Sequence, residues 1–157
     1  MKDLFVTKRA PSGDEVMHAL SVPFQKSTGV SAAKTLTEVD SGSVFYLTQT
    51  TSAFAISLPN AADAGMGWWA EFIVTAIPGS GTPGAITIEA TDGDGDNMHG
   101  HGIDGEDAAQ TVSEGTGFDV ITLINGVTVG DRVKIQCDGA RWFVLSFAAD
   151  KAHITFS

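Results

Sequence analysis

The stretch TDGDGDNMHGHG holds the residues whose types and spacing best suit metal binding. Asp92, Asp94 and Asp96 stand at alternate positions, like the first oxygen ligands of an EF-hand calcium loop. The rest of that pattern is absent, because Asn97 stands where the loop requires Gly and Ile103 where it requires Glu. An EF-hand is therefore excluded. The alternatives are a looser calcium site that uses later acidic residues and a solvated acidic loop.

His99 and His101 form a second candidate group in the same stretch. In an extended segment, residues two apart project to the same side, so both imidazoles can reach one ion. Two ligands do not close a structural zinc site, whereas three copies on a threefold axis would supply an octahedral set. The pair resembles the histidine pairs that hold iron in trimeric phage spikes, where the motif is repeated. Because it occurs once here, the sequence predicts ordinary loop histidines, no resident metal and no cofactor.

Catalytic chemistry has little support in the sequence. Cys137 falls in phase with Val133 and Ile135, which predicts a small core residue rather than a nucleophile. No G-x-S-x-G elbow or related signature surrounds a serine, and no pair of carboxylates stands out among the acidic residues. We therefore expect that the chain is not an enzyme.

Length and charge limit the function classes further. The 157 residues fit one domain, and the formal net charge is −10. Residues 35–131 contain no Lys or Arg and fourteen acidic residues, so the surface repels phosphate and nucleic-acid binding is not expected. The chain has one cysteine, no secretory signal pattern after Met1, and no apolar run of about 18 residues that would span a membrane. We expect a protein folded in a cytosol, with no membrane partner.

Apolar and polar residues alternate with period two along most of the chain, which predicts β-strands separated by Gly-rich turns. A hairpin is expected over residues 43–58, around the polar turn QTTS, and another around Asp138-Gly139. The expected strands are 43–48, 53–59, 68–75, 85–90, 119–124, 132–137, 141–147 and 152–156. The pattern predicts an all-β, single-domain antiparallel β-sandwich or jelly-roll-like fold over residues 41–157.

The remaining segments predict little regular structure. Residues 61–67 suit one helical turn, and residues 92–110 are loop-like. The first 40 residues pattern weakly and are mildly basic at the start, so we expect an extended N-terminal arm and an edge strand there.

Large aromatic residues suggest a contact surface. The strand 141–147 is apolar on both faces, so it is either central in a sandwich or covered by another subunit. The neighbours Trp68 and Trp69 face opposite sides of their strand, and one of them is expected at an interface. The predicted subunit-interface residues are Trp68, Trp69, Trp142 and Phe143.

Two segments resemble modules of known proteins. The first is DSGSVFYLTQTTSAFAISLPNAADAGMGWWAEFIV, and the second is VGDRVKIQCDGARWFVLS. Their order of strands, Leu-Pro strand end, Asp-Gly turn and Trp strand is similar to structural proteins of tailed bacteriophages. The likeness is greatest to small head decoration (cement) proteins and to tail-fibre or spike domains.

The resemblance implies a virion structural protein on the capsid exterior, assembled in the bacterial cytoplasm. Its expected partners are the major capsid protein and other copies of itself, as a homotrimer. The implied capsid-docking arm contains Lys2, Leu4, Phe5, Val6, Lys8 and Arg9. The alternative is a tail-fibre or adhesin module that binds a host glycan through residues 91–110 and an exposed Trp, with or without a metal.

Overall fold

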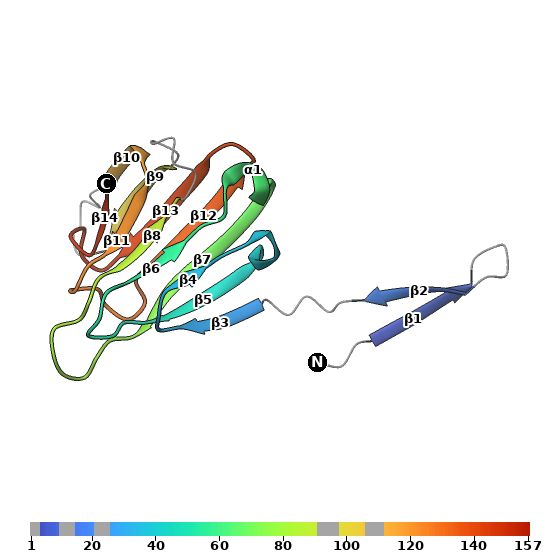
Figure 1. Ribbon diagram of the computed structural model, residues 1–157, viewed down its shortest axis with the longest axis horizontal. Helices are drawn as coiled ribbons and strands as arrows, with labels where there is room; N and C mark the ends of the chain where they lie inside the picture. Colours follow the sequence, from blue (N-terminus) through green and yellow to red (C-terminus); the bar gives the residue numbers. More distant parts are fainter. Residues whose placement is uncertain (1–3, 10–14, 21–25, 91–97, 106–111) are drawn as a thin grey trace.

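The computed structural model describes residues 4–9, 15–20, 26–90, 98–105 and 112–157. Two sheets, of seven and five strands, face each other as a sandwich, and a two-stranded sheet lies apart from them at the N-terminal end (Figure 1). The short helical segments are η1 (Glu38–Asp40) and α1 (Ala61–Ala64). The all-β sandwich expected from the alternating pattern is confirmed, and a jelly-roll order is not.

The seven-stranded sheet has its longest strand near its middle. In spatial order it contains β10 (Val112–Phe118), β9 (Met98–Asp104), β13 (Trp142–Ala148), β12 (Arg132–Asp138), β7 (Met66–Ala76), β5 (Ser43–Thr48) and β3 (Lys26–Val30). The hairpin expected around Asp138-Gly139 is present, because β12 and β13 pair antiparallel from Arg132↔Phe147 to Cys137↔Trp142. Gly139 has a φ of 93°, which explains the Gly at this turn.

The five-stranded sheet is built from shorter strands. In spatial order it contains β14 (Ile154–Phe156), β11 (Val120–Leu123), β8 (Ile86–Glu89), β6 (Phe54–Ser57) and β4 (Lys34–Thr35). β3 and β4 each stand at one edge of their sheet, so residues 26–35 contribute an edge strand to both layers.

Both sheets are mixed, which corrects the expectation of purely antiparallel pairing. β13 pairs parallel with β9, β5 with both β3 and β7, and β6 with both β4 and β8. Parallel pairing arises because the chain crosses from one sheet to the other between these strands, so successive strands are seldom neighbours.

The hairpin expected over residues 43–58 is wrong for the same reason. β5 lies in the seven-stranded sheet and β6 in the five-stranded sheet. Gln49 lies buried where the chain crosses, and its side-chain amide donates to the carbonyl oxygens of Gly84 at 2.8 Å and Ile124 at 2.9 Å. These bonds hold a corner between the layers rather than a turn within one sheet.

The expected loop over residues 92–110 is also wrong in part, because residues 98–104 form strand β9. Its glycines, typical of loops, are required by packing. A Cβ on Gly100 would overlap the carbonyl oxygen of Val144 and lie 2.7 Å from its Cβ, and one on Gly102 would lie 3.0 Å from the hydroxyl of Ser146. The close approach of β13 therefore accounts for glycine in this strand.

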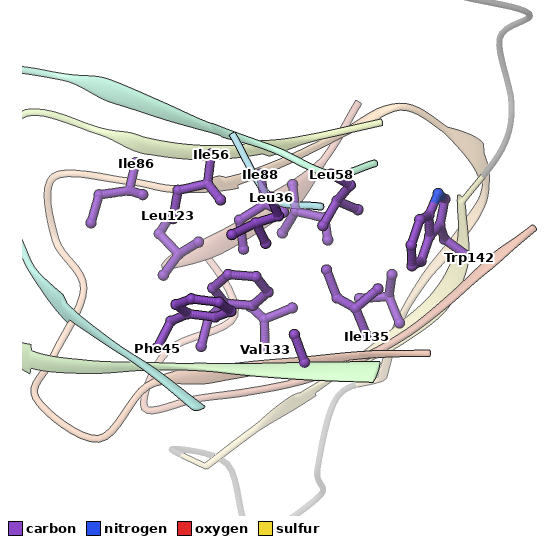
Figure 2. Close-up of a cluster of buried hydrophobic side chains, with 14 of the residues drawn as sticks. Leu36, Phe45, Ile56, Leu58, Ile86, Ile88, Leu123, Val133, Ile135 and Trp142 are labelled. Atoms are coloured by element: carbon purple, nitrogen blue, oxygen red, sulfur yellow. The ribbon is translucent and has the colours of Figure 1, made fainter. Parts of the chain in front are cut away.

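The core fills the space between the two sheets. Figure 2 shows Ile56, Ile86 and Ile88 from the five-stranded sheet above Phe45 and Val133 from the seven-stranded sheet. Cys137 is buried in the same core, as its phase predicts. The layers are therefore joined mainly by burial of apolar surface.

The N-terminal hairpin forms a sheet of its own. β1 (Leu4–Arg9) and β2 (Glu15–Leu20) pair antiparallel, from Leu4↔Leu20 to Arg9↔Glu15. Neither strand pairs with the other two sheets, and Figure 1 shows the hairpin at a distance from the sandwich. The expected single arm is thus folded back on itself in these residues.

Candidate interaction surface on the seven-stranded sheet

One side of the seven-stranded sheet packs on the core and the other is solvent-facing. Along β12, Val133, Ile135 and Cys137 are buried, whereas the intervening residues are exposed. We call the solvent-facing side chains of β5, β7, β9, β12 and β13 the aromatic face. Its residues are Tyr46, Trp69, Glu71, Ile73, His99, His101, Arg132, Lys134, Gln136, Phe143, Leu145 and Phe147.

The strand register arranges these side chains in rows across the sheet. Because directly paired residues share a face, each row is a line of neighbours. One row runs through His99, Phe143, Gln136 and Trp69, the next through His101, Leu145, Lys134 and Glu71, and the third through Phe147, Arg132, Ile73 and Tyr46. The side chains of β13 on this face, Phe143, Leu145 and Phe147, therefore form an apolar strip between the histidines of β9 and the charged side chains of β12 and β7.

Two cations of β12 lie over aromatic rings of this face. The guanidinium of Arg132 is 4.8 Å from the ring centroid of Phe147, and its Nη1 is 3.9 Å from Oε1 of Glu71. The ammonium of Lys134 is 5.7 Å from the ring of Trp69. At exposed sites a cation–π contact contributes about 0.5–1 kcal/mol. Trp69 is thus partly covered, whereas Phe143 and Leu145 remain 46% and 37% exposed.

Two adjoining shallow hollows mark the surface around Phe143. One is lined by Lys134, Gln136, Phe143 and Leu145. The other is lined by Met66, Gln136, Asp138 and Phe143, and Met66 is 86% exposed. Phe143 borders both hollows and is more exposed than Tyr46 or Leu145, the other exposed apolar side chains of the face.

Asp138 supplies a fixed negative charge at the rim. The backbone N–H groups of Ala140 and Arg141 donate to its Oδ1 at 2.8 and 2.7 Å. These bonds, with the nearby Arg141 charge, lower the pKa of the Asp138 carboxyl against a small opposing effect of desolvation. The group is therefore ionised at neutral pH, and its contribution to the β12–β13 turn is lost only as pH falls through this lowered pKa.

The outer side of the five-stranded sheet has a different chemistry. Thr155, Thr122, Thr87 and Ala55 form one row across it by strand register. Within the described part of the chain, no exposed large apolar side chain lies on a strand of this sheet. The two sides of the sandwich thus differ, and only the aromatic face has the composition of a contact surface.

The structure divides the four predicted interface residues into two pairs. Trp69 and Phe143 lie on the aromatic face, as an interface requires. Trp68 and Trp142 do not, which corrects the prediction for them: they are 2% and 0% exposed and pack edge-to-face, with ring centroids 5.1 Å apart. Alternation along β7 and β13 places one residue of each adjacent pair in the core.

The candidate metal ligands are only partly brought together. His99 and His101 face the same side of β9, as their spacing predicts, and the ring of His99 lies 6.4 Å from that of Phe143. Asp92, Asp94 and Asp96 lie outside the described residues. Among the described residues, no group of three or more His, Cys, Asp or Glu side chains is placed to hold a metal ion.

The candidate docking arm maps to the N-terminal hairpin. Leu4, Phe5, Val6, Lys8 and Arg9 belong to β1, whose backbone pairs with β2. A further predicted residue, Lys2, lies outside the described residues.

Sequence reasoning missed a buried polar cluster around Asp131. Its carboxylate accepts hydrogen bonds from the backbone N–H groups of Thr128 and Ala149, each at 2.8 Å, and lies 2.9 Å from Nδ1 of His153. Asp131 is 3% exposed. The cluster joins the turns that precede β12 and β14, and so it stabilises the end of the sandwich. The motif Val-Gly-Asp gave no signal of this cluster, because two of the three partners, Ala149 and His153, lie 18 and 22 residues further along the sequence.

No helix within the described residues is long and apolar enough to cross a membrane. Comparisons of the chain with protein families, with curated proteins and with solved structures found no match. The function is therefore inferred from the chain's own sequence and surfaces.

Proposed function

We propose that the chain is a structural protein of a bacteriophage virion, a decoration (cement) protein on the outer surface of the head. In this role it stabilises contacts between major capsid subunits as a homotrimer. The observation that carries the proposal is the division of the molecule into a compact sandwich with one apolar outer face and a separate N-terminal hairpin. The resemblance of residues 40–74 and 129–146 to phage structural modules supports the same role.

The hairpin suits attachment to another protein. Its two strands pair only with each other, so each outer edge offers backbone donors and acceptors to a neighbouring sheet. Residues 1–20 contain three basic residues, Lys2, Lys8 and Arg9, and three acidic residues, so this segment is formally neutral in a chain with net charge −10. An attachment of this kind needs no large contact area, because many copies on a closed shell bind with high avidity.

Deletion of residues 1–20 is expected to abolish binding to phage heads and to leave the sandwich folded. The reason is that β1 and β2 contribute no strand to either sheet of the sandwich. The measurement is cosedimentation with heads prepared without the protein, with circular dichroism as the control for folding. Unchanged cosedimentation of a folded truncated chain would show that the hairpin is not the attachment segment.

A host-binding adhesin module is the second candidate. The observation that favours it is the pair of hollows around Phe143, where an exposed ring adjoins the side chains of Gln136 and Asp138. Such a ring can pack on the apolar side of a sugar, while the polar groups bind its hydroxyls. Saturable glycan binding by the isolated protein would support this role, and loss of that binding with a chelator would implicate a metal.

A further inference from the structure

We infer that the aromatic face is covered by a second copy of this chain. This inference adds to the proposed function by naming the surface through which the copies meet. The expected number of copies, three, rests on the proposed function. The surface itself is identified from the structure alone, by its apolar exposure, its size and its charge.

The first observation is where the exposed apolar side chains lie. Tyr46, Phe143 and Leu145 are all exposed on this one side of the sandwich, and Trp69 and Phe147 are half-buried among them. Aromatic residues and Arg are enriched in the cores of protein interfaces. Arg132, stacked on Phe147, completes this composition.

The second observation is the size of the face. Strands lie about 4.8 Å apart and rise about 3.3 Å per residue. The five strands of the aromatic face, with six to eleven residues each, therefore present a surface of roughly 600 Å² in projection. A standard interface buries about 800 Å² on each partner, so the face and its margins are large enough for a stable contact.

The third observation is charge. Between residues 35 and 131 the chain has fourteen acidic residues and no Lys or Arg, and its net charge is −10. Copies of such a chain repel one another unless cations meet the acidic surface. The aromatic face presents two cations, Arg132 and Lys134, against Glu71. Another copy, which is strongly acidic, has the complementary charge.

A glycan fits the same face less well. Sugar platforms rely on open aromatic rings, and the ring of Trp69 lies beneath the ammonium of Lys134. That leaves Phe143 as the most open aromatic ring at the two hollows.

Sedimentation equilibrium of the purified full chain tests the inference without any capsid. The wild-type chain is expected to form an oligomer, and Phe143→Glu is expected to raise its dissociation constant about 30-fold or more, as the loss of an interface hot spot does. The matched control is Thr155→Glu, which adds the same charge on the exposed side of the five-stranded sheet and is expected to leave the mass unchanged.

A second measurement keeps the inference testable if Phe143→Glu fails to fold. Hydroxyl-radical labelling of the wild-type chain at low and high concentration is expected to show protection of Phe143 and Tyr46 at high concentration, with Val129, which lies outside the face, labelled equally at both. A wild-type monomer at all concentrations, or an oligomer unaffected by a folded Phe143→Glu variant, would overturn the inference. Glycan binding by a monomer that shields Phe143 would also overturn it.

These outcomes are separable from those of the proposed function. A chain that oligomerises through the aromatic face and does not bind heads supports the inference and contradicts the decoration role. A monomer that binds heads through residues 1–20 supports the decoration role and contradicts the inference.

Discussion

Replacing Gly100 with alanine is expected to lower the free energy of unfolding by about 3 kcal/mol, the upper part of the range for overpacked cores. The added Cβ would overlap the carbonyl oxygen of Val144 and approach its Cβ to 2.7 Å. Since these atoms belong to the paired strand β13, relief requires β9 to move away and lose parallel hydrogen bonds. Urea denaturation followed by tryptophan fluorescence measures the change.

Gly29→Ala is the matched control for this substitution. Gly29 also lies in a strand of the seven-stranded sheet, but a Cβ there would meet no atom within 4 Å. The unfolding free energy of the Gly29→Ala variant is expected to stay within about 0.5 kcal/mol of the wild-type value. If Gly100→Ala is no more destabilising than Gly29→Ala, the close approach of β9 to β13 is not a constraint on the fold.

Replacing Asp131 with alanine is expected to lower the unfolding free energy by a similar amount, about 3 kcal/mol. The substitution removes a carboxylate that is itself buried, together with the part-buried hydrogen bonds that it accepts from the N–H groups of Thr128 and Ala149 and its contact with His153. Three interactions with a charged acceptor, each worth about 1 kcal/mol or more, account for the size of the expected loss. Differential scanning calorimetry and urea denaturation both measure this loss.

Asp131→Asn separates the hydrogen bonds from the charge. Asparagine keeps one oxygen, so it can still accept from one of the two backbone N–H groups, and its destabilisation is expected to be intermediate. Equal stability of wild type and both variants would mean that water replaces the carboxylate, and that the cluster does not stabilise this end of the sandwich.

The sequence predicted the strands well wherever burial is one-sided. Residues 132–137 alternate strictly, and the structure has β12 there with Val133, Ile135 and Cys137 buried. Period-two alternation works in such strands because one face meets the core and the other meets water. Strand pairing was harder to predict, because it depends on which layer each strand enters. The crossing at Gln49 depends on carbonyl groups of Gly84 and Ile124, which no local pattern reveals.

Strand β9 shows a second limit of sequence reasoning. The Gly-rich run that forms it favours a loop by composition, and only contact with β13 explains why small residues are needed there. Of the four residues predicted at the interface, only two lie on the aromatic face. Adjacent strand residues face opposite sides, but the sequence does not say which of Trp68 and Trp69, or of Trp142 and Phe143, faces the core.

The parallel pairing of β9 with β13 also has a consequence for synthesis of the chain. Strand β9 pairs with β13, which is synthesised about 40 residues later, and β7 pairs with β12, which also follows it in the chain. A nascent chain that ends before residue 130 therefore lacks the central strands of its larger sheet. Folding is therefore expected to begin only when translation is nearly complete. Topologies rich in such non-local pairs fold over roughly milliseconds to seconds. The supply of folded chains would then depend on folding after release from the ribosome.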